Sequence, residues 1–82
     1  MLDGFRAQKR MLRKEIRNYV VANQEDLEMN YGMKIPKDVK NMYKRDFEAW
    51  IDTICVKRTP KILHDLLVEY DCACQGIEEF SV

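Results

Sequence analysis

Residues that break helices are scarce in this chain. Its 82 residues include three glycines and two prolines. Few breakers favour long helices, and the five that occur punctuate the chain at Gly4, Gly32, Pro36, Pro60 and Gly76. No segment alternates apolar and polar residues with a period of two over any length, so strands are not expected. The sequence therefore predicts an all-α protein.

Groups that carry catalysis or hold metals are also scarce. His64 is the single histidine, and Ser81 is the single serine and lies in the tail, so a Ser-His-Asp arrangement is not expected. Three cysteines are an odd number and too few for a disulfide scaffold. Cys72 and Cys74 point to opposite sides of a helix, and no Cys-x-x-Cys motif, phosphate loop or dinucleotide motif occurs. We expect a protein that is not an enzyme, with no metal site and no cofactor.

Long apolar runs are missing as well. A membrane span needs a run of roughly 18 apolar residues or more. No run in this chain approaches that length, and the first residues lack the apolar core of a secretory signal. Together with the cysteine content, this favours the cytoplasm, or the host cytoplasm if the protein is virus-encoded. The length predicts a single helical domain over 1–82.

Helix start and stop signals divide the chain into three segments. Asp3 is suited to an N-cap, and Gly32 is suited to a left-handed helix stop. Pro36 and Pro60 are suited to the first turns of two further helices. The expected fold is a three-helix bundle with helices at about 3–29, 36–57 and 60–79.

The last segment has the most regular apolar pattern. Its apolar residues recur at alternating spacings of three and four, as in a coiled-coil seam. We expect a core or oligomer seam formed by Leu63, Leu66, Tyr70, Ala73, Ile77, Phe80 and Trp50. The first helix is also longer than its neighbours, and Met11, Val20 and Val21 lie off its main apolar stripe. A second chain covering that surface would make the protein a homo-oligomer.

The net charge of zero conceals a division along the chain. Residues 1–45 carry eleven basic and six acidic side chains, a balance of +5, and residues 46–82 carry three basic and eight acidic, a balance of −5. Successive helical residues turn by about 100°, so six cations of the first helix fall within about 140° of its circumference. Glu15 is the single opposing charge among residues 6–17. This basic face consists of Arg6, Lys9, Arg10, Arg13, Lys14 and Arg17.

The basic face has three interpretations. It is a solvated surface or pairs with the acidic last helix of the same or a neighbouring chain; it binds an acidic protein; or it binds a phosphate-bearing ligand such as nucleic acid, a nucleotide or an anionic lipid. The sequence pI of about 6.6 and the lack of aromatics between the cations disfavour a general nucleic-acid binder.

We therefore predict a small interaction protein, such as an adaptor or an inhibitor of viral type, that binds and modulates an acidic protein partner. The first alternative is a binder of nucleic acid or of a small phosphorylated ligand through the same face. The second is an oligomeric structural or assembly protein.

Overall fold

The computed structural model describes the backbone of residues 2–80 and the side chains of residues 4–77. The described backbone is helical and contains no β-strand. Its elements are α1 (Leu2–Ala22), α2 (Gln24–Tyr31), the 3₁₀ turn η1 (Val39–Asn41), α3 (Lys44–Ile51), the 3₁₀ turn η2 (Val56–Arg58) and α4 (Lys61–Phe80). None of the helices in this part of the chain is long and apolar enough to cross a bilayer.

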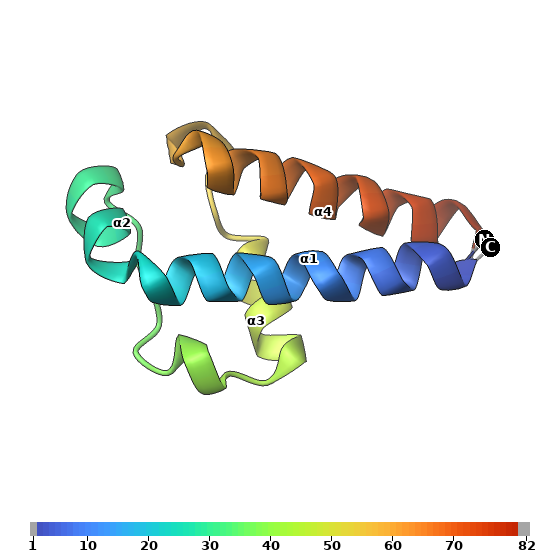
Figure 1. Ribbon diagram of the computed structural model, residues 1–82, viewed down its shortest axis with the longest axis horizontal. Coiled ribbons are helices and arrows are strands. Elements are labelled where there is room, and N and C mark those ends of the chain that lie inside the picture. The colour runs from blue at the N-terminus through green and yellow to red at the C-terminus, as the bar shows by residue number, and fades with distance from the viewer. Residues whose placement is uncertain (1, 81–82) are drawn as a thin grey trace.

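The two long helices, α1 and α4, form the main packing unit. They lie side by side and antiparallel, so the beginning of α1 and the end of α4 are at the same end of the molecule (Figure 1). Gly76 of α4 is buried, and a Cβ at that position would lie 2.7 Å from the ring of Phe5. The absence of a side chain at Gly76 is what allows Phe5 to lie this close to α4.

The first predicted helix, 3–29, is wrong as one continuous element. It is interrupted at Asn23, whose backbone has φ −121° and ψ 25° and whose Nδ2 donates to the carbonyl oxygen of Tyr19 at 2.9 Å. Asparagine side chains compete with the helix for backbone groups in this way. The predicted stop is confirmed, because Gly32 ends α2 with φ 63°.

The second predicted helix, 36–57, is also wrong in extent. Only Lys44–Ile51 is α-helical, and Met42 before it is extended, with φ −62° and ψ 142°. Thr53 caps the end of α3, since its Oγ1 donates to the carbonyl oxygen of Trp50 at 2.6 Å and its N–H donates to the same oxygen at 2.9 Å. The β-branched residues that follow disfavour a return to the α-helix. The described chain thus has four α-helices rather than three.

The third predicted helix agrees closely with α4, which begins directly after Pro60. Of its predicted seam, Leu63, Tyr70 and Ala73 are buried, whereas Leu66 and Ile77 are half-buried. Leu67, which the seam omitted, is buried instead of Leu66, because α4 presents a broad face to its neighbours rather than a narrow coiled-coil stripe. Phe80 lies outside the described side chains.

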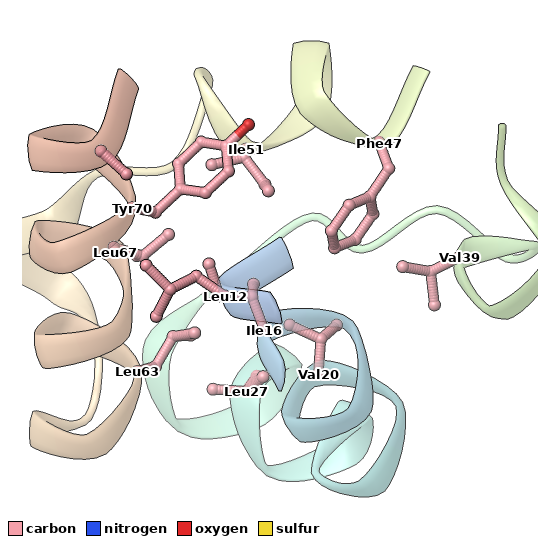
Figure 2. Close-up of a cluster of buried hydrophobic side chains, with 11 residues drawn as sticks. Leu12, Ile16, Val20, Leu27, Val39, Phe47, Ile51, Leu63, Leu67 and Tyr70 are labelled. Atoms are coloured by element: carbon pink, nitrogen blue, oxygen red, sulfur yellow. The ribbon is translucent and has the colours of Figure 1, made fainter. Parts of the chain in front are cut away.

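The core is assembled from every helix (Figure 2). Phe47 and Ile51 point from α3 toward the apolar stripe of α1, and residues of α4 close the other side (Figure 2). The buried apolar residues are Leu12, Ile16, Val20, Leu27, Val39, Phe47, Ile51, Leu63, Leu67, Tyr70 and Ala73. Val20 is fully buried by its own chain and therefore needs no second chain to cover it, whereas Met11 is 63% exposed.

Candidate functional site

The basic face of α1 consists of two rows of cations, each with a spacing of four residues. The outer row, Arg6, Arg10 and Lys14, is exposed. The inner row, Lys9, Arg13 and Arg17, is half-buried. Residues four apart lie above one another on a helix, so each row runs along one side of α1. The inner row packs against the protein, and the outer row faces solvent.

The inner row holds α3 through Glu48. Arg13 Nη1 donates to Glu48 Oε1 at 2.7 Å, and Lys9 Nζ lies 3.6 Å from the same oxygen. The side chains of Arg13 and Glu48 are 15% and 25% exposed, so solvent screens this contact less than a surface ion pair. A hydrogen bond between charged groups in this setting contributes about 1–3 kcal/mol.

Aromatic rings give the inner row a second set of contacts. The guanidinium of Arg17 lies 4.5 Å from the ring centroid of Phe47, and Lys9 Nζ lies 5.8 Å from that of Tyr70. A cation over a ring contributes about 0.5–1 kcal/mol at an exposed site and more where water is excluded. The inner row thus joins α1 to both α3 and α4.

One interpretation of the sequence paired the basic face with the acidic last helix of the same chain. Among the described side chains, the ion pairs of the basic face run to Glu48 of α3 and none runs to an acid of α4. The internal pairing therefore exists, but it involves a different helix and only the inner row.

Four of these cations and one from α3 line a cleft of about 280 Å³, which we call the cationic cleft. Its lining residues are Arg10, Arg13, Lys14, Arg17 and Lys44. No described Asp or Glu lines it. Sequence reasoning missed Lys44 because nothing in the linear pattern shows that the start of α3 lies beside the middle of α1.

Trp50, assigned by sequence to the core or an oligomer seam, is half-buried and holds the loop after α2. Its Nε1 donates to the carbonyl oxygen of Lys34 at 2.9 Å, and its ring centroid lies 5.7 Å from that of Phe47. It borders a hollow of about 320 Å³ together with Tyr31 and Ile54. Its described contacts are internal.

The thiols and the histidine are dispersed. Cys55 and Cys72 are exposed and Cys74 is half-buried, and all three are free. Burial raises the pKa of the Cys74 thiol above its ordinary value. His64 Nδ1 lies 3.4 Å from the Asp65 carboxylate at the surface. Within residues 4–77, no group of three or more His, Cys, Asp or Glu side chains is placed to hold a metal ion.

Comparison with protein-family models, with curated protein sequences and with solved structures found no match to this chain. The basic face and its cleft are therefore interpreted from their own geometry and charge.

Proposed function

We propose that this protein is a small, non-enzymatic binding module that recognises an acidic protein partner through the basic face of α1 and modulates it. The observation that carries the proposal is the division of that face. The inner row is engaged with α3 and α4, while the outer row is left available to an outside molecule.

The outer row supports this function because its charges have no internal use. The side chains of Arg6, Arg10 and Lys14 make no hydrogen bond or ion pair with another described residue. They stand along one side of a helix that is fixed by a fully buried stripe, so their spacing is held by the fold. Rigid placement lowers the entropy cost of binding, and complementary charge raises the association rate.

The experiment reverses the outer row and leaves the inner row intact. The variant Arg6→Glu/Arg10→Glu/Lys14→Glu is compared with the native protein in affinity capture from cells, with nuclease treatment. Captured protein is expected to fall at least tenfold, because three attractive contacts become repulsive. Reversing Arg13 or Arg17 would be a poorer test, since it would also disrupt the contacts to Glu48 and Phe47.

The matched control carries the same charge change elsewhere. Lys37, Lys40 and Lys57 are exposed and lie off the basic face, so Lys37→Glu/Lys40→Glu/Lys57→Glu is expected to retain the partner. Equal loss from both triple variants would show that only overall charge matters and would remove the proposal.

A second candidate is a binder of nucleic acid or of a phosphorylated small ligand, and the cationic cleft is the observation that favours it. Binding to an oligonucleotide would weaken steeply with salt, in proportion to the phosphates neutralised. Capture that disappears on nuclease treatment, with a steep salt slope for a purified oligonucleotide, would favour this candidate over a protein partner.

Self-association is the remaining part of the proposal. Met11 and Ile62 are each 63% exposed and offer apolar surface to a second copy. Sedimentation at rising concentration is expected to show a shift from monomer to a larger species, with Met11→Lys reducing the shift. A constant monomer mass up to millimolar concentration would exclude a homo-oligomer.

A further inference from the structure

We propose that the cationic cleft is a binding site for one phosphate monoester, and that the partner of the basic face carries that group as a phosphorylated side chain. The second half of this statement rests on the proposed function; the first half does not. The site combines Arg10, Arg13, Lys14 and Arg17 of α1 with Lys44 at the start of α3.

The cleft is an open hollow between α1 and the start of α3. It has a volume of about 280 Å³ between two elements that are far apart in sequence. Arg13 and Arg17 are half-buried at its inner side, where Glu48 and Phe47 hold them in place. Two of its lining side chains are thus fixed by packing, as a selective site requires.

The residues that line the cationic cleft carry more positive charge than the described carboxylates beside them neutralise. The side chains of Arg10, Lys14 and Lys44 have no hydrogen bond or ion pair with another described residue. Like charges four residues apart on a helix repel one another, as at Arg10 and Lys14. The single described carboxylate paired with a lining residue is Glu48, on Arg13. The excess of positive charge is relieved by an anion that carries more than one negative charge.

A phosphate monoester matches the excess positive charge of the cleft better than a carboxylate does. It carries about −1.5 to −2 charges near pH 7 and three strong acceptor oxygens. Three of the five lining residues are arginine, whose planar fork donates two parallel hydrogen bonds to phosphate. A nucleic acid would extend beyond the cleft on a chain with zero net charge and an acidic second half, so one phosphoryl group is the better match.

The test uses the purified full chain and two pairs of probes. Inorganic phosphate is compared with acetate at equal ionic strength, and a phosphoserine peptide with its unphosphorylated form, by calorimetry and by amide chemical shifts. Phosphate and the phosphopeptide are expected to bind saturably, with shifts centred on residues 10–17 and 44. Acetate and the unphosphorylated peptide are expected to bind at least tenfold more weakly.

Two double variants separate the cleft from overall charge. Lys14→Gln/Lys44→Gln removes two lining charges, whereas Lys57→Gln/Lys61→Gln removes two exposed charges that do not line the cleft. The first variant is expected to weaken phosphate binding at least tenfold, since each hydrogen bond between charged groups contributes a large part of the binding free energy. The second is expected to change it less than twofold, with both variants folded by circular dichroism.

The outcomes separate the cleft as a phosphate site, the phosphorylated partner and nucleic-acid binding from one another. Equal weakening by both variants, or no saturable phosphate binding, overturns the cleft as a site, even if the outer-row variant still loses its protein partner. Phosphate binding without preference for the phosphopeptide supports the cleft for free phosphate or a small phosphorylated ligand and overturns the phosphorylated side chain. An oligonucleotide that binds more tightly than the phosphopeptide, with a steep salt slope, overturns both in favour of nucleic acid.

Discussion

At the scale of single residues, Glu48 links the basic face to the rest of the fold. Its Oε1 accepts a hydrogen bond from Arg13 at 2.7 Å and lies 3.6 Å from Lys9 Nζ. We expect Glu48→Gln to lower the free energy of unfolding by about 1–2 kcal/mol, because two cations lose their counter-charge. Urea unfolding measures this change. The exposed Glu69 provides the control, since Glu69→Gln is expected to change stability by less than about 0.5 kcal/mol.

The same substitution has an opposite effect on the cationic cleft. Removing the Glu48 charge frees Arg13 to bind an outside anion, so the affinity for inorganic phosphate is expected to rise while stability falls. Calorimetry on Glu48→Gln checks this result. A loss of phosphate binding in a folded variant would instead mean that Glu48 is needed to position Arg13.

Two glycines provide a further prediction at the residue scale, because replacing them with alanine is expected to change stability in opposite directions. At Gly76 a Cβ would lie 2.7 Å from the ring of Phe5, while at Gly4 it would meet no atom of the described residues within 4 Å. Alanine is favoured over glycine in a helix by about 1 kcal/mol, so Gly4→Ala is expected to stabilise by up to that amount. Gly76→Ala is expected to destabilise by about 1 kcal/mol, because overpacking costs more than the helix gain.

Thermal melting of the two variants under identical conditions makes the comparison. Equal stabilisation by both would show that Phe5 moves aside without cost and that the close approach to α4 is not tightly packed.

At the scale of elements, sequence and structure agree where a local signal is strong. Gly32 and Pro60 mark helix boundaries through backbone conformations that their own chemistry dictates, and both boundaries are observed. The prediction of one long helix over 36–57 was wrong because apolar residues continue on both sides of α3, at Met42 and Ile54, although the backbone leaves the helix near both. Periodicity records which side chains are buried, and short segments can bury the same residues without one continuous helix.

The candidate site, like the helices, was predicted from the sequence only in part. Helical spacing alone placed six cations on one face of α1, and all six lie on a helix in the structure. Lys44 and Glu48 could not be assigned, because their positions beside α1 depend on how the chain returns after Gly32. The outer and inner rows were also indistinguishable in sequence, since burial is set by α3 and α4 rather than by α1 itself.

The end of α2 gives an element-scale prediction. Gly32 has φ 63°. This left-handed conformation costs about 1–2 kcal/mol for most residues with a side chain. We expect Gly32→Ala to lower the free energy of unfolding by about 1 kcal/mol, measured in urea. Asparagine tolerates this conformation better than alanine, so Gly32→Asn is expected to lower the free energy of unfolding by less than Gly32→Ala does. An equal loss in both would point to a contact at Gly32 rather than to its backbone.

At the scale of the whole molecule, stability is expected to depend on pH in the alkaline range. Burial, followed by the neighbouring Cys74 thiol, raises the pKa of Tyr70 above its ordinary 10.0, and burial raises the pKa of Cys74 above 9.0. Below about pH 8 both groups keep most of their protons in the folded and the unfolded chain. Above it the unfolded chain releases protons that the folded chain retains, so the free energy of unfolding falls as pH rises.

Urea unfolding between about pH 8 and pH 10 measures this slope. The expected result is a decline that is shallower in Cys74→Ala and in Tyr70→Phe than in the native protein. Identical slopes in all three proteins would assign the alkaline loss to other groups.

The antiparallel packing of α1 on α4 has a consequence for how the chain reaches this state. The helix that covers the apolar stripe of α1 is the last of the described helices to be synthesised, and the contact between Phe5 and Gly76 closes a loop over most of the described chain. Closing so large a loop carries an entropy cost that a contact within one helix does not carry. A growing chain therefore leaves the side of Leu12 and Ile16 that faces α4 uncovered until α4 emerges from the ribosome. Transiently exposed apolar surface makes a nascent chain prone to aggregate, so this interval is the vulnerable part of its synthesis.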